Sequence, residues 1–239
     1  MLRRVFGLAV AAAFAVALGG SAQPPKLTPE QTKAKNALKN LEEFLGIWNL
    51  EGSVKAGGKE TIWKEQVDWS WKFKAAEPTI KLTFNEGKGK FFTTGDLTYD
   101  VAAKKYKLAL TSADKTQSVY TGDFKNQVLK VERKDDKTGD VQRLVMNTLA
   151  DGVRFQMKVE KQEGGKGLFL EAFKMAGNKD GESLAGAAKK AECIVTGGAA
   201  SIAVSFQGKQ YFVCCSGCRD AFNEDPAKFI AAAAKAGKK

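Results

Sequence analysis

The chain has 239 residues, 44% of them hydrophobic, which is enough for one domain of ordinary size and a small second module. It contains no histidine, which excludes Ser-His-Asp and Cys-His nucleophile systems and histidine-coordinated haem, zinc hydrolase and copper oxidase sites. We therefore expect a binding protein and no enzyme.

The net charge is +11, but the lysines are spread singly along predicted strands, so we expect a solvated basic face and no nucleic-acid partner; they include Lys72, Lys81, Lys107, Lys130 and Lys158.

Residues 1–22 have the three parts of a secretory signal peptide. Arg3 and Arg4 give a basic start, residues 5–18 are apolar, and small residues end at Ala22, where we expect cleavage. The apolar run is too short for a comfortable membrane span, and no later segment approaches one. The sequence thus predicts an exported protein, periplasmic or secreted, that does not span a membrane.

Residues 23–45 are predicted to carry an N-terminal helix, from about residue 29 to residue 45. Thr28 can cap it, Pro29 suits its first turn, and Gln31 occupies the capping-box position. Leu38, Leu41 and Leu45 then recur at steps of three and four residues, which is typical of an amphipathic helix.

Between residues 47 and 175 apolar and polar residues alternate, and turn sequences at 85–87, 134–139 and 162–167 separate the runs. About ten short antiparallel strands with no helix between them favour a closed barrel, because each strand has one buried face and a barrel has no unpaired edge. The residues expected to share that face, strand by strand, are Trp63, Val67, Trp69, Trp71 and Phe73; Ile80, Leu82 and Phe84; Leu97, Tyr99 and Val101; Tyr106, Leu108 and Leu110; Tyr120 and Phe124; Leu129 and Val131; and Val153, Phe155, Met157 and Val159.

The start of this region resembles lipocalin-like barrels, which open with a Gly-x-Trp motif, here Gly46, Ile47 and Trp48. Residues 95–100 (GDLTYD) and 105–106 (KY) are similar to a bacterial secreted lipocalin-like family of unknown function. The resemblance implies a mainly β fold, an antiparallel up-and-down barrel over residues 46–176. Such a barrel can carry a small apolar ligand, but we expect the aromatic side chains of residues 63–73 to fill it by packing.

Two acidic residues, Glu65 and Glu171, interrupt otherwise apolar faces. Paired carboxyl groups can perform general acid-base catalysis. Strand edges, salt bridges or a shifted register explain them more simply, so neither is predicted to be catalytic.

Residues 177–190 are small and polar and are predicted to be a linker. In the module that follows, residues 191–239, Ala203 to Phe206 and Tyr211 to Val213 flank a turn as a hairpin. Pro226 is expected to begin a terminal helix. The hairpin places Cys214 and Cys215 at the exit of its second strand.

All four cysteines lie in this module, in the pattern C-x20-C-x3-C formed by Cys193, Cys214 and Cys218, with Cys215 adjacent. Thiolates so spaced can surround one metal ion if a hairpin brings Cys193 back beside the others. Disulfides are the alternative in an exported protein, although adjacent cysteines make two bridges awkward. A thiol-disulfide oxidoreductase using Cys215 and Cys218 is a further alternative, without the βαβ context of thioredoxin and with Arg219 as the nearest activating cation.

Residues 191–232 resemble the YHS or TRASH-type domains, small cysteine modules linked to heavy-metal sensing and handling. The resemblance lies in the three-cysteine spacing, in the following Phe222 and in Asp225 and Pro226. It departs at Ile194, where the family usually has proline, and in the absence of histidine. The resemblance implies a small α+β, treble-clef-like module.

Together these features predict an exported protein that holds one zinc or copper ion. The proposed ligands are Cys193, Cys214 and Cys218, with Cys215 either the fourth ligand or outside the set. The alternative is a lipocalin-like carrier of a small apolar ligand, in which the cysteine module is a disulfide-bonded structural element.

Overall fold

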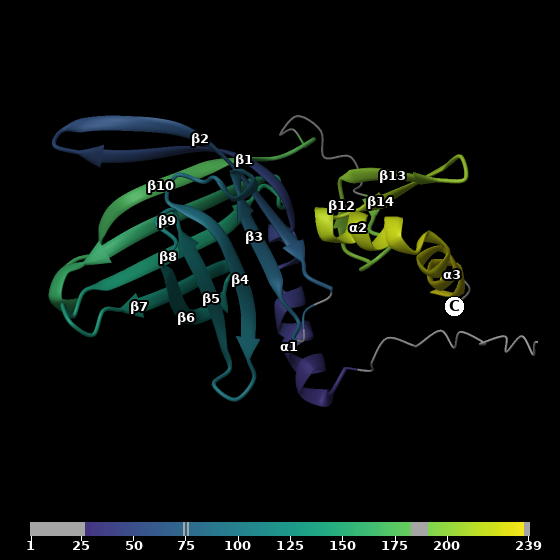
Figure 1. Ribbon diagram of the computed structural model, residues 1–239, viewed down its shortest axis with the longest axis horizontal. Helices are drawn as coiled ribbons and strands as arrows, with labels where there is room; N and C mark the ends of the chain where they lie inside the picture. The colour runs from purple at the N-terminus through teal and green to yellow at the C-terminus, as the bar shows by residue number, and fades with distance from the viewer. Residues whose placement is uncertain (1–26, 74, 76, 183–190, 237–239) are drawn as a thin grey trace, which may run out of the picture.

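The computed structural model describes residues 27–73, 75, 77–182 and 191–236, and in these residues the chain is mainly β. The predicted signal peptide, and residues 183–190 of the predicted linker, lie outside the described residues. A β-barrel preceded by a helix comes first along the chain, and the cysteine module follows it (Figure 1).

Ten strands of the described chain form a closed antiparallel barrel, which confirms the predicted architecture. They are β1 (Gly46–Ala56), β2 (Lys59–Trp71), β3 (Ile80–Phe84), β4 (Phe92–Asp100), β5 (Lys105–Ser112), β6 (Gln117–Lys125), β7 (Val128–Lys134), β8 (Val141–Leu149), β9 (Arg154–Gln162) and β10 (Leu170–Lys179). Each strand pairs with the next in sequence, and β1 pairs with β10 to complete the ring. Two short 3-10 turns lie in the connections, η2 (Asn85–Gly87) after β3 and η3 (Glu163–Gly165) after β9.

Aromatic side chains fill the barrel interior, because alternate residues of every strand point inward. Near one end Trp69 contacts Phe44 and Phe155, with ring centroids 5.3 Å and 5.9 Å apart, and Trp48 contacts Phe155 at 5.3 Å. Nearer the other end Trp63 contacts Phe91 and Phe173. This packing agrees with the expectation that the barrel is filled by its own side chains.

The N-terminal segment covers one end of the barrel. Helix α1 (Pro29–Lys39) has the predicted capping box between Thr28 and Gln31. The prediction that it runs to residue 45 is wrong, because the Asn40 N–H turns back to the Ala37 carbonyl and a 3-10 turn, η1 (Glu42–Phe44), follows. The turn carries Phe44 into the barrel, where its carbonyl accepts a hydrogen bond from Trp48 Nε1 at 2.7 Å.

Three predicted details of the strands differ in the structure. Phe73 lies beyond the end of β2 and is 48% exposed, because the Lys72 N–H makes the last pairing, to the Thr79 carbonyl, before the chain turns. Val101 likewise follows the end of β4. Strand β10 extends past residue 176, because Gly177 and Asn178 still pair with β1.

The cysteine module consists of two small hairpins and two helices. They are β11 (Ala191–Glu192) paired with β12 (Ala199–Ala200), β13 (Ile202–Phe206) paired with β14 (Lys209–Val213), and the helices α2 (Ser216–Glu224) and α3 (Pro226–Ala236). The β13–β14 hairpin and the helix beginning at Pro226 agree with the sequence prediction. Helix α2 was not predicted.

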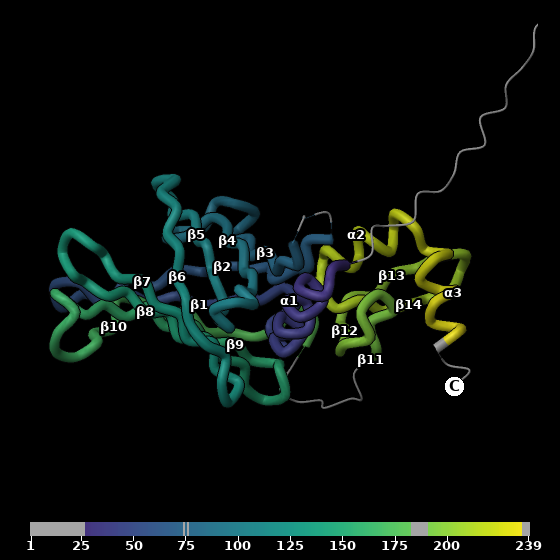
Figure 2. The backbone as a smooth tube through the Cα atoms, turned by 90° about the horizontal axis from the view of Figure 1, so that it is seen from below, coloured from purple at the N-terminus to yellow at the C-terminus, as the bar shows by residue number. Residues whose placement is uncertain are grey.

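The module lies at the end of the barrel that α1 covers (Figures 1 and 2). Buried residues of the barrel and of the module belong to one continuous apolar cluster. In the part of the chain that the structure describes, no helix is long and apolar enough to cross a membrane. The arrangement places the cysteines next to the barrel wall.

Candidate metal centre

A tight turn between β11 and β12 presents Cys193. The Cys193 N–H donates to the Gly198 carbonyl and the Gly197 N–H donates to the Cys193 carbonyl, both at 2.7 Å. Gly197 has a φ of +80°, a conformation that glycine adopts without steric cost. The Ile194 N–H donates to the Phe212 carbonyl, which holds this turn against β14.

The other cysteines come from the junction between β14 and α2. Cys214 and Cys215 follow the last residue of β14, and Cys218 lies in the first turn of α2. The Sγ atoms of Cys193, Cys214 and Cys218 all lie within 4.8 Å of one another. The segment between Cys193 and Cys214 therefore folds back and brings the two cysteines together, as expected from their spacing. Three of the four proposed ligands converge.

These distances suit a shared metal ion. Cys214 Sγ and Cys218 Sγ are 3.5 Å apart. Sulfur atoms bound to one tetrahedral zinc ion at about 2.3 Å lie about 3.8 Å apart, so the cluster needs little rearrangement to enclose an ion. All four cysteines are free in the structure and at most 4% exposed.

Cys215 lies beside the cluster without joining the group of three. Its Sγ is 3.8 Å from Cys214 Sγ, but it is not within 4.8 Å of all three other sulfur atoms. Its surroundings include the backbone of Trp71, at the end of β2. Cys215 thus interacts both with the cysteine cluster and with the barrel backbone.

The four thiols share hydrogen bonds, and their pKa values move apart. Hydrogen bonds from Cys214 and then Cys218 lower the pKa of Cys193 and lower the pKa of Cys215 to about 3. Hydrogen bonding with Cys193 is the largest cause that raises the pKa values of Cys214 and Cys218. Cys215 occupies the N-cap position of α2, where the helix dipole also favours negative charge, although its side chain makes no capping hydrogen bond. These shifts favour the thiolate form, which binds metals, at Cys193 and Cys215 and the thiol form at Cys214 and Cys218.

Barrel strand β2 forms one wall of the site. Ser216 Oγ donates a hydrogen bond to Asp68 Oδ2. Gly217 lies so close to Trp71 that an added Cβ would be 2.1 Å from the Trp71 carbonyl oxygen. The sequence indicated no role for Asp68, Ser216 or Gly217, and its only signal was the presence of two small residues directly before Cys218.

The two acidic residues noted in the sequence have separate surroundings. Glu65 is 4% exposed, and its Oε2 accepts a hydrogen bond from Trp63 Nε1 at 2.9 Å. Burial raises the pKa of this carboxyl group. Glu171 is exposed on β10 and forms an ion pair with Lys174 at 3.6 Å. Each acid thus has a structural partner of its own.

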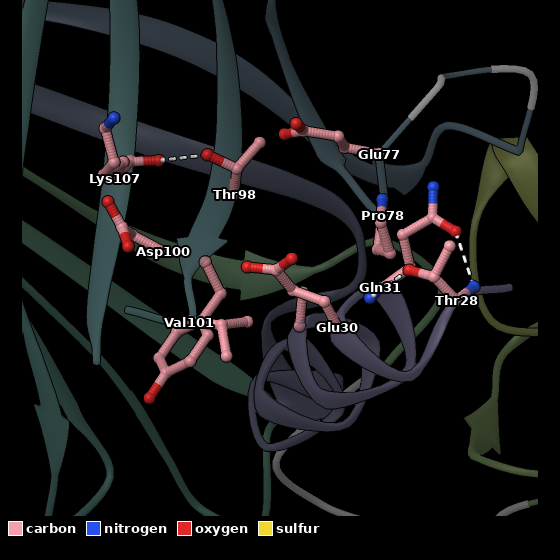
Figure 3. Close-up of a pocket in the computed structure, with 11 residues that line it drawn as sticks. Thr28, Glu30, Gln31, Glu77, Pro78, Thr98, Asp100, Val101 and Lys107 are labelled. Atoms are coloured by element: carbon pink, nitrogen blue, oxygen red, sulfur yellow. Dashed lines mark hydrogen bonds between the residues drawn. The ribbon is translucent and has the colours of Figure 1, made fainter. Parts of the chain in front are cut away.

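A cavity of about 400 Å³ lies away from the cysteines, between the start of α1 and strand β4 (Figure 3). Glu30, Glu77, Asp100 and Lys107 are among its lining residues. Thr98 Oγ1 donates a hydrogen bond to the Lys107 carbonyl at 3.4 Å. Among the described residues, the carboxyl groups of this cavity do not belong to any converging group of potential metal ligands, whereas the cysteines do.

Compared with known families and with curated proteins, the chain matches no family model and no curated sequence.

Proposed function

We propose that this is an exported protein that binds one soft or borderline metal ion, zinc or copper(I), at Cys193, Cys214 and Cys218. The observation that carries the proposal is the convergence of three buried sulfur atoms within 4.8 Å from two segments of the chain. Buried cysteines can pack simply as small apolar residues, so it is the convergence of their sulfur atoms on one point, and not their burial, that points to a metal ion.

The donor atoms favour these two metals. Thiolate sulfur selects Cu(I) and Zn(II), whereas Mg²⁺ and Ca²⁺ require oxygen ligands. Three sulfur ligands suit trigonal Cu(I), and a fourth ligand completes a tetrahedral zinc site. The sequence resemblance to cysteine modules of metal handling points to the same class of function, and the signal-like first 22 residues support export.

A binding role is favoured over catalysis. Cys215 and Cys218 have the spacing of a redox motif, but a hairpin precedes them and two helices follow, unlike the βαβ unit of thioredoxin-like enzymes. Both are fully buried, which is unfavourable for attack on a protein disulfide.

The test is a metal titration of the reduced protein. We expect one Zn(II), Co(II) or Cu(I) per chain, with proton release on binding. Substitution of Cys193, Cys214 or Cys218 by Ser should weaken binding by more than the roughly 10- to 100-fold typical of residues outside the coordination shell.

Cys215→Ser is the matched control, because it removes a thiol from the same buried cluster. If Cys215 lies outside the coordination shell, Cys215→Ser will weaken metal binding less than the other three substitutions do. If Cys215 is the fourth ligand, the substitution will weaken metal binding equally. Native protein that contains no metal, and whose four cysteines are paired in disulfides by mass spectrometry, would refute the proposal.

A further inference from the structure

A cavity of about 370 Å³ lies between the helix-covered end of the barrel and the turn that presents Cys193. One side is formed by residues of α1 and η1 and by Trp71 and Phe73 at the end of β2. Helix α1 lies next to the β11–β12 hairpin in Figure 2. The other side is formed by residues 195–199. The volume falls within the range of ordinary small-molecule pockets.

This cavity reaches the metal centre from one side. Of the four cysteines, Cys214 alone lines it. Thr196 also lines it, and Thr196 Oγ1 is 3.6 Å from Cys214 Sγ. Because all four cysteines are nearly inaccessible, a small molecule that approaches the centre through this cavity meets Cys214 first.

The charged residues of the cavity are two cations and one anion. Lys35 and Lys39 are one turn apart on the same face of α1, and Glu42 follows in η1. No ion pair joins any of the three to another residue in the described ranges. Their charges are available to a ligand, while Leu45, Trp71, Phe73 and Val195 supply apolar walls.

We propose that this cavity binds a small thiol that carries both a carboxylate and an ammonium group, as L-cysteine does. Lys35 and Lys39 would bind its carboxylate, and Glu42 would bind its ammonium group. Its thiolate would take the coordination position that Cys193, Cys214 and Cys218 leave open on a tetrahedral metal. This inference rests on the proposed function, because the ligand needs the metal for its third contact.

The test uses the purified protein loaded with one Co(II) and titrated with L-cysteine. Calorimetry measures the affinity, and the sulfur-to-cobalt absorption bands report a new sulfur ligand. We expect saturable 1:1 binding with increased absorption, and much weaker binding of L-serine, which lacks the thiol, and of cysteamine, which lacks the carboxylate. The double variant Lys35→Ala/Lys39→Ala should lose at least about tenfold in L-cysteine affinity while binding Co(II) as before. Lys130→Ala, an exposed lysine on β7, is the matched control and should leave both affinities unchanged.

The outcomes separate the two proposals. Failure to bind one Co(II) refutes the metal function itself. If the protein binds one Co(II) normally, three results would refute only the cavity inference. In these results L-cysteine leaves the spectrum unchanged, extracts the metal, or binds equally well to the double lysine variant.

Discussion

Ser216, the first residue of α2, donates a hydrogen bond from its Oγ to Asp68 Oδ2 on barrel strand β2. The two residues are far apart in sequence, and their contact fixes the helix that carries Cys218 against the barrel wall. The next residue, Gly217, packs on the backbone of Trp71 in the same strand. The cysteine module is therefore held by the barrel through residues directly beside the metal ligands.

Removal of the Ser216 hydroxyl should destabilise the protein. Burial raises the pKa of Asp68, and the hydrogen bond from Ser216 opposes that shift, so Ser216→Ala leaves a half-buried carboxyl group without its partner. We expect a loss of about 1 to 3 kcal/mol in the free energy of unfolding, measured by urea denaturation. Ser205→Ala, an exposed serine on β13, is the control. Equal stability of the two variants would show that the contact contributes nothing.

Gly217 should be essential for the geometry of the metal centre. In Gly217→Ala the new Cβ would lie 2.1 Å from the Trp71 carbonyl oxygen, so α2 must move away from β2 and carry Cys218 with it. We expect Zn(II) affinity to fall by roughly 10- to 100-fold, as for other changes just outside a coordination shell. Competition with a chromophoric chelator measures it.

Gly58→Ala provides the comparison for this substitution. Gly58 lies between β1 and β2, and nothing lies within 4 Å of an added Cβ, although its positive φ makes alanine strained there. Its metal affinity should equal that of the unsubstituted protein. Unchanged affinity in Gly217→Ala as well would mean that α2 is not positioned by this contact.

The stability of the barrel should depend on pH through Glu65. Burial raises the pKa of this carboxyl group above its ordinary value of 4.5, and the hydrogen bond from Trp63 only partly opposes the shift. An acid with a higher pKa in the folded state binds its proton more tightly when folded, so its contribution is fully present below about pH 4.5 and is lost as the pH rises through the folded pKa. Asp68, whose pKa is also raised, acts in the same direction.

Glu65→Gln should reduce this decline in stability with rising pH, because the amide does not titrate. Urea unfolding of both proteins between about pH 4 and pH 7 measures the difference in slope. Glu171→Gln, at an exposed position on β10, should keep the original slope. If Glu65→Gln keeps it too, Glu65 does not titrate differently in the folded and unfolded states.

The barrel could be predicted from the sequence because its information is local. Ile80, Leu82 and Phe84 alternate with polar residues, and all three are buried in β3. The convergence of Cys193 with Cys214 and Cys218 could also be predicted, since their spacing allows a hairpin to bring them together. Local alternation was sufficient to predict the strands, and the spacing of the cysteines was sufficient to predict their convergence.

The wall of the site could not be predicted in this way. Helix α2 is a nine-residue segment whose buried side chains are only Cys218 and Phe222, too few to show a helical period. The contact of Ser216 with Asp68 joins two regions that no local pattern connects. The exposed position of Phe73 depends on where β2 stops pairing with β3, and element boundaries are the least determined feature of a periodic sequence.

The barrel should fold without the cysteine module. A chain that ends at Glu182 keeps all ten strands and also Lys179, whose Nζ donates to the Glu43 carbonyl at 3.1 Å and ties β10 to η1. The ring of strand pairs is complete without residues 191–236, so we expect the strand circular dichroism and a cooperative unfolding transition to persist. The melting temperature should fall, because Trp71 and neighbouring apolar residues lose their cover, and tryptophan fluorescence should shift to longer wavelength.

A chain ending at residue 176 is the informative comparison: it also lacks Gly177, Asn178 and Lys179, which pair with β1, and should be less stable than the first truncation. Loss of cooperative unfolding in the chain ending at Glu182 would show that the barrel requires the module to fold.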